Sequence, residues 1–312
     1  MSDYIRKEGV PIVLAFTPSY FIPAATFLNS LLENSDLSDC YDLICLLTED
    51  LPEVMKRELE CLGGERIAVT YMNLDGYLKE IYIDDRYTVA ASFRLILPDV
   101  LPGYDKVLYM DCDIIVRNNM AELYRSSDMG DRYLAAVHEA TLDFQEKNIK
   151  DLGCEPGYYF NSGVLLMNLT LMRKNNMTEK FLEAAQIEGL EFPDQDVLNQ
   201  LCKGNVLALA PHYNSIRTFY LPKYKADFLK RYNEADWDAV QKHGNVHYTG
   251  SKPWNSFTVE FDVWWESYFN LPKSIRSYGQ ISKKMLIFSK MYKTNMGKRL
   301  IDMLRNLYRK IK

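Results

Sequence analysis

The sequence predicts an α/β protein with a twisted central sheet, helices on both faces of that sheet and a separate helical tail. Apolar segments of strand length alternate with helical segments over residues 11–72, an order typical of parallel strands joined by crossover helices. A later apolar run, residues 107–116, is interrupted by two aspartates. Residues 273–312 combine helical spacing with strong positive charge, which sets them apart from the rest of the chain.

Composition indicates a globular protein with a substantial core. The chain has 312 residues, of which 47% are hydrophobic and 13% aromatic, enough for one large domain or for a domain with an appendage. The six cysteines are scattered, form no C-x-x-C pair and mostly have apolar neighbours, which indicates free thiols rather than disulfides or a zinc site. We find no signal-peptide pattern and no apolar stretch of membrane-spanning length, so we expect a cytoplasmic location for the bulk of the chain.

Residues 11–72 contain three apolar segments of strand length and two amphipathic segments of helix length. The expected strands are 11–16, 41–48 and 67–72, and the expected helices are 24–33 and 52–62. This order predicts parallel pairing of the three strands. Because ligands bind beyond the carboxyl ends of such strands, we expect the loop Thr17–Tyr20 to lie at the binding edge of the sheet.

The middle of the chain continues with shorter strands and helices. The expected elements are strands at 134–138 and within 158–168, and helices at 88–97, 171–189 and 197–203. The tetrapeptide Pro193-Asp-Gln-Asp196 is expected to cap the last of these helices, because aspartate is a favoured N-cap residue.

Two aspartates interrupt the apolar run from Val107 to Val116. Residues two apart on a strand point to the same side, so we expect Asp111 and Asp113 to share one face. Two neighbouring anions repel each other, and they are costly to bury unpaired. Mg²⁺ or Mn²⁺, which prefer oxygen ligands, would remove both penalties. The alternative is a strand end with two solvated aspartates, because Asp-x-Asp is a short and common pattern.

Other polar residues allow both a structural and a functional interpretation. Arg94 lies in an apolar helical segment and needs an anionic partner, which is a surface acid, a ligating aspartate or a phosphate. Asn161 either lies in a turn or directs its side-chain amide at a polar ligand. His247 is either a structural histidine or a third ligand for the cation. Gly250 permits close backbone approach, and Lys252 would neutralise phosphate charge.

Five short motifs follow one another along the chain. They are VLAFTPSY, ASFRLILPDVLPGYDKVLYMDCDIIV, YFNSGVLLMNL, FPDQDVLN and VHYTGSKPW. Taken together, in this order and at these spacings, they resemble glycosyltransferase family 8, whose members include bacterial lipooligosaccharide galactosyltransferases and glycogenin. The resemblance covers residues 10–265 and excludes the tail.

The resemblance implies a GT-A fold, a Rossmann-like nucleotide-sugar-binding architecture with a mixed central sheet, which binds a UDP-sugar with Mn²⁺ or Mg²⁺. It implies metal ligands at Asp111, Asp113 and His247, with Asp111 also facing the donor ribose. It places Gly250 and Lys252 at the diphosphate. The remaining implied site residues are Thr17 and Tyr20 at the uracil, Arg94, Asn161, Asp194 and Gln195 around the donor sugar, and Glu139 near the sugar or the acceptor.

The chain departs from the family pattern at two places. The first loop commonly carries an aspartate that contacts uracil, whereas this chain has Thr17 followed by Pro18. A threonine hydroxyl still forms hydrogen bonds, although it discriminates less between bases. The loop after His247 is one residue shorter than in some members, which changes the reach of Lys252.

The activity implied by the resemblance is transfer of a hexose, galactose or glucose, from UDP to a hydroxyl of a glycan, glycolipid or glycoprotein, with retention at the anomeric carbon. Gln195 takes the family's position nearest that carbon, and an amide is a poor nucleophile, so we favour attack from the leaving-group side. One alternative is a non-catalytic nucleotide-sugar-binding or scaffolding module that the tail recruits to the membrane. Another is a nucleotidyltransferase, but that requires a Gly-rich or Lys-rich loop after the first strand, and FTPSYF is neither.

The tail carries the opposite charge to the rest of the chain. Residues 273–312 have a net charge of +11, and the remainder has −16. Apolar residues spaced by three or four predict one basic amphipathic helix, or two broken near Gly297. We therefore expect a catalytic domain over 1–265 and a tail over 266–312 that binds the anionic inner face of the cytoplasmic membrane. The alternatives are packing on the acidic body and a dimer contact; binding to nucleic acid is disfavoured because the acidic body repels phosphate.

Overall fold

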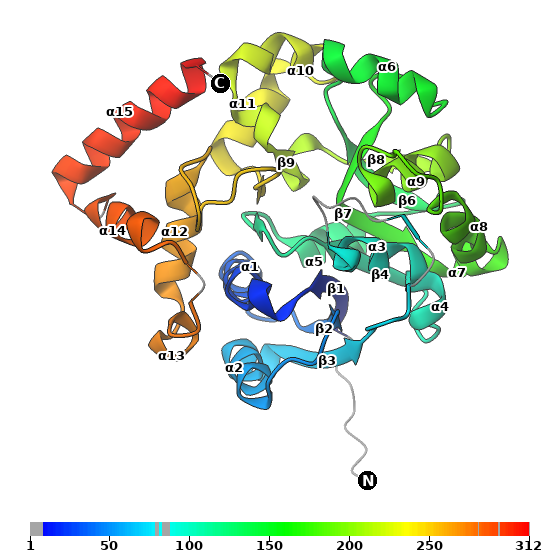
Figure 1. Ribbon diagram of the computed structural model, residues 1–312, viewed down its shortest axis with the longest axis horizontal. Coiled ribbons are helices and arrows are strands. Elements are labelled where there is room, and N and C mark those ends of the chain that lie inside the picture. The colour runs from blue at the N-terminus through cyan, green and yellow to red at the C-terminus, as the bar shows by residue number, and fades with distance from the viewer. Residues whose placement is uncertain (1–8, 79–80, 83–87, 280, 293, 312) are drawn as a thin grey trace.

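The computed structural model describes residues 9–78, 81–82, 88–279, 281–292 and 294–311. A seven-stranded sheet lies at the centre, with helices on both of its faces (Figure 1). The strand order is β3-β2-β1-β4-β7-β6-β8. The strands are β1 Val10–Phe16, β2 Tyr41–Leu47, β3 Ile67–Asn73, β4 Lys106–Met110, β6 Leu134–His138, β7 Phe160–Asn168 and β8 Val206–Ala208.

The sheet is mixed, as predicted. β1 pairs in parallel with β2 and β4, and β2 pairs in parallel with β3, which confirms the parallel arrangement expected for the first three strands. β7 is antiparallel to both β4 and β6. The reversal at β7 brings the start of that strand to the edge where β4 ends, because Met110 pairs with Val164.

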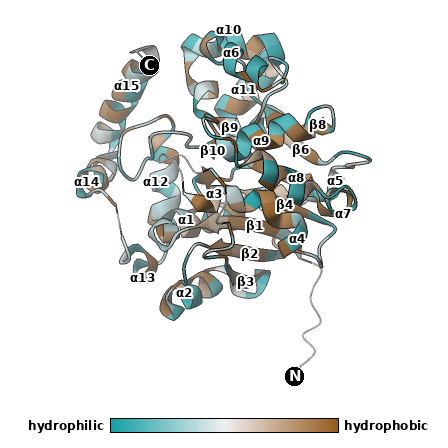
Figure 2. Cartoon of the chain, turned by 45° about the vertical axis from the view of Figure 1, so that its right-hand side comes forward, coloured by the Kyte–Doolittle hydropathy of each residue, from teal (hydrophilic) through white to brown (hydrophobic). Residues whose placement is uncertain are grey.

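Strand β1 forms the centre of the core. All seven of its residues are buried, which is typical of a strand covered on both faces. On one face, Ile12 and Leu14 join a hydrophobic cluster that includes Phe27 of helix α1 (Phe21–Glu33). On the other face, Val13 joins a second cluster that includes Val197 of helix α9 (Pro193–Cys202). Hydrophobic residues accordingly concentrate on the strands between the two helical layers (Figure 2).

Two layers of helices cover the sheet, and further helices surround it. The first layer contains α1 Phe21–Glu33, α2 Glu53–Gly63 and α12 Phe261–Asn270, and the second contains α3 Val89–Ser92, α4 Leu97–Val100, α7 Leu169–Lys174, α8 Met177–Ala184 and α9 Pro193–Cys202. The others are α5 Met120–Ser126, α6 Asp143–Asp151, α10 Lys225–Arg231 and α11 Glu234–His243.

Local structure in the middle of the chain differs in detail from what the sequence predicts. The helix expected over 88–97 consists of α3, a 3-10 turn over Phe93–Ile96 and α4. The helix expected over 171–189 is divided into α7 and α8, because Asn176 takes a left-handed conformation with φ of 50°. Of the two alternatives left open for Asn161, the turn is excluded, because Asn161 belongs to β7.

A second, three-stranded sheet positions the polar residues at the edge of the main sheet. It contains β5 Ile114–Ile115, β9 Ser215–Ile216 and β10 Val246–His247 in the order β5-β10-β9. His247 pairs with Ile114, so the histidine lies beside the Asp111-Cys-Asp113 segment. That segment forms a turn between β4 and β5, which corrects the extended conformation expected for the two aspartates.

The C-terminal helices pack along one side of the body (Figure 1). They are α13 Lys273–Arg276, α14 Lys283–Tyr292 and α15 Asn295–Ile311. The break between α14 and α15 precedes Gly297, and α12 runs through the boundary expected at 265/266. Within the described part of the chain, every helix is too short or too polar to cross a bilayer. Lys293 and Lys312 of the predicted basic tail lie outside the described residues.

Candidate active site

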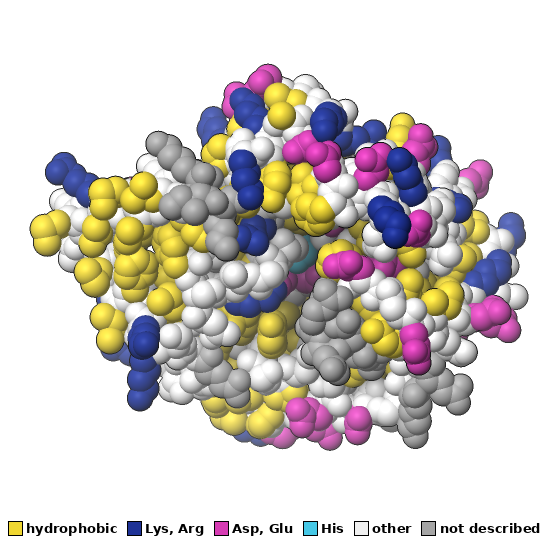
Figure 3. All heavy atoms as spheres, turned by 45° about the horizontal axis from the view of Figure 1, so that its top comes forward, with side chains coloured by type: hydrophobic (Ala, Val, Ile, Leu, Met, Phe, Trp, Pro, Cys, Tyr) yellow, Lys and Arg dark blue, Asp and Glu magenta, His cyan; other side chains and the backbone are white. Residues whose placement is uncertain are grey.

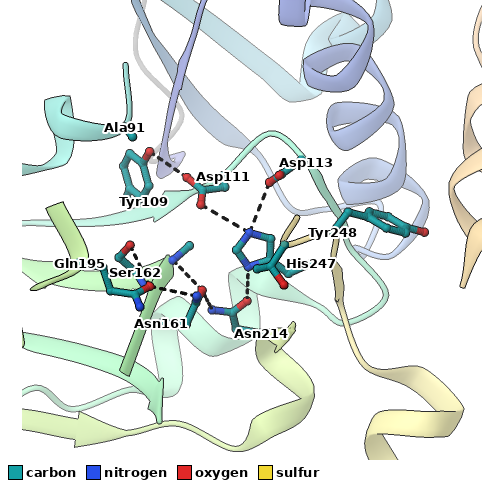
Figure 4. Close-up of polar contacts among 12 residues, drawn as sticks. Ala91, Tyr109, Asp111, Asp113, Asn161, Ser162, Gln195, Asn214, His247 and Tyr248 are labelled. Carbon is teal, nitrogen blue, oxygen red and sulfur yellow. Dashed lines mark hydrogen bonds and ion pairs between the residues drawn. The ribbon is translucent and has the colours of Figure 1, made fainter. Parts of the chain in front are cut away.

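Three potential metal ligands converge at the edge where β4 ends. Asp111 follows β4, Asp113 precedes β5, and His247 ends β10. The His247 Nε2 atom lies 3.5 Å from Asp111 Oδ2 and 3.4 Å from Asp113 Oδ1 (Figure 4). One ligand atom of each residue lies within 4.8 Å of the others. Figure 3 shows a hollow in this face of the molecule, with a histidine side chain at its bottom.

The second polar atom of each ligand is held by a neighbour. Asp111 Oδ1 accepts hydrogen bonds from Arg94 Nη2 at 2.8 Å and from the Tyr109 hydroxyl at 3.0 Å. Asp113 Oδ2 accepts one from Lys252 Nζ. His247 Nδ1 lies 2.9 Å from the side-chain oxygen of Asn214. Two carboxylate oxygens and one imidazole nitrogen therefore face a common position, and this set of donors fits Mn²⁺ or Mg²⁺.

The carboxyl group of Asp113 is held in its charged form. Burial by itself raises the pKa of this carboxyl, but the positive charge of Lys252 and the contact with His247 outweigh burial and hold the pKa well below its usual range. Burial lowers the pKa of Lys252, and the Asp113 carboxylate more than reverses this effect. A charged ligand oxygen is therefore available for a cation.

Arg94 links the candidate metal ligands to the start of α9. Its side chain is only 3% exposed, and its Nε atom lies 3.1 Å from Asp194 Oδ2 while Nη2 binds Asp111. The partners of this buried cation are thus two aspartates, one of the alternatives that the sequence left open. Asp194 lies in the first turn of α9, whose N-cap is Phe192, so the N-cap role expected for Asp194 is wrong. Burial raises the pKa of Asp194, and Arg94 only partly offsets this rise.

Three polar side chains form a buried cluster next to Arg94. Asn161 Nδ2 donates to Gln195 Oε1 at 3.0 Å and to Glu139 Oε1 at 3.2 Å. Gln195 Nε2 lies 3.3 Å from the same Glu139 oxygen. Burial raises the pKa of Glu139, and hydrogen bonds from the amides of Asn161, Gln145 and Gln195 offset this only in part. The cluster presents amides and a carboxyl group beside the cation position, a composition suited to holding sugar hydroxyls.

The family assignment follows from a comparison with family models. The model described as Glycosyl transferase family 8 matches residues 11–258, a range that contains every residue of the site described above. The chain belongs to glycosyltransferase family 8. The resemblance inferred from the five sequence motifs is thereby confirmed.

Known relatives agree with this assignment. General stress protein A of Bacillus subtilis (strain 168) is 28% identical over 81% of this chain and 90% of its own length. A lipopolysaccharide 1,2-glucosyltransferase of Escherichia coli is 31% identical over 81% of this chain and 75% of its own length. The crystal structure of galactosyltransferase LgtC, in complex with donor and acceptor sugar analogs, matches with a TM-score of 0.69 at 24% identity, over 86% of this chain and 99% of LgtC. The last likeness shows that this family 8 glycosyltransferase has the GT-A fold.

The residues expected at the nucleotide, Thr17 and Tyr20, follow β1, which pairs with β4 on the side opposite β7. In this family 8 glycosyltransferase, Tyr20 packs edge-on against Trp254, with ring centroids 5.7 Å apart. Burial raises the pKa of the Tyr20 phenol. The positive charge of Lys252 lowers this pKa, and the negative charge of Asp113 raises it. The Thr17 hydroxyl lies 2.6 Å from the hydroxyl of Ser19.

Gly250 lies in the loop that follows His247. It has a φ of 84°, a left-handed conformation that favours glycine, and a β-carbon at this position would meet no atom within 4 Å. The backbone of this loop is therefore open to a ligand.

The sequence did not single out Gly163 and Asn214. A β-carbon on Gly163 would lie 2.7 Å from His247 Nδ1 and 2.9 Å from Asp111 Oδ2, so only glycine fits beneath the candidate metal ligands of this family 8 glycosyltransferase. A glycine inside a strand often marks such a close approach, and that signal was present in Asn-Ser-Gly. Asn214 comes from a loop before β9, and no pattern in the sequence indicated its role.

Proposed function

We propose that this protein is a retaining hexosyltransferase that moves galactose or glucose from UDP to a hydroxyl of a glycan, glycolipid or glycoprotein. The observation that carries the proposal is the arrangement of Asp111, Asp113 and His247. Each has one ligand atom held by a neighbour and the other directed at a shared position. The relatives named as lipopolysaccharide glucosyltransferase and galactosyltransferase support a glycan or glycolipid acceptor, and hence a role in cell-surface glycan synthesis.

Asp111, Asp113 and His247 would hold Mn²⁺, with Mg²⁺ as a substitute. When bound, such an ion stabilises the negative charge that develops on a departing diphosphate. Lys252 adds a second positive charge next to Asp113. This charge would also stabilise the negative charge of the departing diphosphate. The open backbone at Gly250 allows the diphosphate to approach this loop. On the base side, the partly buried ring of Tyr20 would stack on uracil, and the Thr17 hydroxyl would bond to it.

The donor sugar would lie between Arg94, Asp194 and the amide cluster. Arg94 is fixed by two aspartates, so the carboxylate of Asp194 is held rigidly for a sugar hydroxyl. Gln195 is fixed by Asn161 and Glu139, and its amide is a poor nucleophile. Retention would then come from attack on the side of the leaving group, with a phosphate oxygen of UDP accepting the proton of the acceptor hydroxyl.

The C-terminal helices would attach the enzyme to an anionic membrane from the cytoplasmic side. On α15, Ile301 faces the body and is 1% exposed, whereas the apolar residues between 40% and 84% exposed are Met296, Leu300, Met303 and Leu307. Lys298 and Arg299 are exposed next to them. Figure 3 shows hydrophobic side chains gathered with basic ones over this side of the molecule. An exposed apolar stripe flanked by basic residues is suited to lying in a lipid interface.

A UDP-release assay tests the catalytic proposal. We expect release from UDP-galactose or UDP-glucose with Mn²⁺, loss of release with EDTA, and a product whose new linkage keeps the donor's α configuration. Asp113→Ala should reduce the rate by about 10²-fold or more, because one electrostatic contact to the transition state is typically worth that much. A β-linked product would contradict the retaining mechanism. Binding of Mn²⁺ and UDP without turnover on any UDP-hexose would instead favour a non-catalytic binding module.

A further inference from the structure

Asn214 connects the metal ligands to the sugar-binding amides without belonging to either group. It is fully buried, with 0% of its surface exposed. Its side-chain nitrogen lies 2.8 Å from Asn161 Oδ1, and its side-chain oxygen lies 2.9 Å from His247 Nδ1 (Figure 4). Both contacts span more than thirty residues of sequence, so the bridge exists only in the folded chain.

The orientation of this bridge follows from one unambiguous donor. The backbone N–H of Gly163 can only donate, and it lies 3.0 Å from Asn161 Oδ1, so that atom of Asn161 is the oxygen. The Asn214 atom that faces this oxygen must be a donor, which is Nδ2. The Asn214 oxygen therefore faces His247, and Nδ1 of the imidazole carries the hydrogen that is donated to it. The amide and tautomer assignments follow from the hydrogen-bond network.

The tautomer determines what His247 offers to the metal position. With the hydrogen on Nδ1, the neutral ring has its lone pair on Nε2, which faces Asp111 Oδ2 and Asp113 Oδ1. A lone pair directed at two carboxylate oxygens is repulsive unless a proton or a metal cation lies among them. Nε2 is therefore the ring nitrogen available to a bound metal cation, and Asn214 imposes that arrangement.

We propose that Asn214 is a positioning residue that holds His247 in its metal-binding tautomer and, through its other hydrogen bond, sets the orientation of the Asn161 amide next to the donor sugar. The proposal rests on the proposed function, in which the three ligands hold a divalent cation. It assigns Asn214 two separable contributions: an acceptor for His247, which affects metal affinity, and a donor to Asn161, which affects transfer once metal is saturating.

Two substitutions separate these contributions. Asn214→Leu removes both the acceptor and the donor at similar volume. Without the acceptor, the two carboxylates favour a hydrogen on His247 Nε2, which blocks that ligand atom. We expect Mn²⁺ affinity to fall about 10- to 100-fold, as is typical when the partner of a metal-bound histidine is removed. Asn214→Asp keeps an acceptor for Nδ1–H but loses the donor to Asn161, so we expect near wild-type Mn²⁺ affinity and a lower kcat at saturating Mn²⁺.

A Mn²⁺ titration of the full-length chain, carried out with and without UDP, tests the proposal. The EPR signal of free Mn²⁺ measures how much of the ion remains unbound. Asn118→Leu is the control, because Asn118 bonds to His212, His243 and Asn245 but not to His247; its Mn²⁺ affinity should remain that of the wild type. Equal affinity in Asn214→Leu and wild type would overturn the proposal alone. So would a 10-fold or greater loss of Mn²⁺ affinity in Asn214→Asp, a result that stays decisive if the Leu variant does not fold. Absence of Mn²⁺ binding by the wild type, with and without UDP, would instead remove the proposed function as well.

Discussion

The α-carbon of Gly163 lies against the imidazole ring of His247, so closely that a β-carbon would come within 2.7 Å of Nδ1. The same β-carbon would lie 2.9 Å from Asp111 Oδ2. Strand β7 therefore lies directly beneath the proposed metal position, and its backbone approaches two of the three candidate ligands without an intervening side chain. The peptide N–H of Asp111 donates to the Gly163 carbonyl at 2.8 Å, which fixes this part of β7 to the end of β4.

Gly163→Ala is expected to displace His247 or Asp111 and to weaken Mn²⁺ binding strongly. Adding a methyl group to a tightly packed interior typically destabilises by about 1–3 kcal/mol, so the variant should fold with a lowered melting temperature. Gly103→Ala is the matched control, because its β-carbon would meet no atom within 4 Å and its φ is not left-handed. Mn²⁺ titration and thermal unfolding of both variants check this. Unchanged Mn²⁺ affinity in Gly163→Ala would contradict the close packing of ligands on β7.

Lys252→Met is expected to separate metal binding from donor binding. Lys252 holds one oxygen of Asp113, and its positive charge opposes a nearby cation while favouring a diphosphate. Without Lys252, Mn²⁺ alone should bind as tightly as before or more tightly, whereas UDP-sugar binding in the presence of Mn²⁺ should weaken by about tenfold or more. Lys252→Arg keeps the charge and should retain part of the donor affinity. Calorimetric titrations with Mn²⁺ and with UDP-sugar measure the two effects. Weaker Mn²⁺ binding with unchanged UDP-sugar binding in Lys252→Met would contradict the prediction.

Leu307→Glu on α15 is expected to reduce binding to vesicles made of equal parts phosphatidylcholine and phosphatidylglycerol. The substitution removes an exposed apolar contact and adds a negative charge, which together should weaken binding about tenfold. Leu37→Glu adds the same charge at an exposed leucine in the loop after α1, and it should leave binding unchanged. Cosedimentation measures the bound fraction, and UDP release on a water-soluble acceptor should be equal in both variants. Equal binding of the two variants would exclude α15 as the membrane contact.

The stability of the protein is expected to fall as the pH decreases from 6.5 to 4, in part because of His138. Burial, together with the neighbouring Arg231, lowers the pKa of His138 from 6.5 to about 4. The unfolded state therefore binds more protons than the folded state in this window, so the free energy of unfolding rises with pH. This residue should contribute about 2 kcal/mol between pH 5 and 7.5. Urea unfolding of wild type and His138→Gln at both pH values checks the difference, and an identical pH dependence of the two proteins would contradict it.

The fold was largely predictable because the periodicity of apolar residues and the order of strand and helix segments along the chain determine it. The three expected strands of residues 11–72 are β1, β2 and β3, because apolar runs of this length have few alternatives. The divided helices were missed for local reasons. Asn176 adopts a left-handed conformation, and the spacing of apolar residues in a helical segment does not indicate such a break. The antiparallel insertion of β7 could not be derived from periodicity, which does not indicate strand direction, and the family resemblance implied only that the sheet is mixed.

The site was predictable where a residue's chemistry stands out from its neighbours. Asp111 and Asp113 interrupt an apolar strand, and Arg94 interrupts an apolar helical segment, so each required a polar partner in any fold. Asn214 has no such contrast, because it lies in an ordinary polar loop. Its importance arises only from the pairing of β9 with β10, a long-range contact that places it beside His247.

Diffraction from crystals soaked with Mn²⁺ and UDP tests the metal site most directly. At the manganese absorption edge, we predict one strong anomalous peak bounded by Asp111 Oδ2, Asp113 Oδ1 and His247 Nε2, with diphosphate oxygens completing its coordination. A bound nucleotide with no peak between these atoms, or with the imidazole turned away from the two aspartates, would contradict the proposed function.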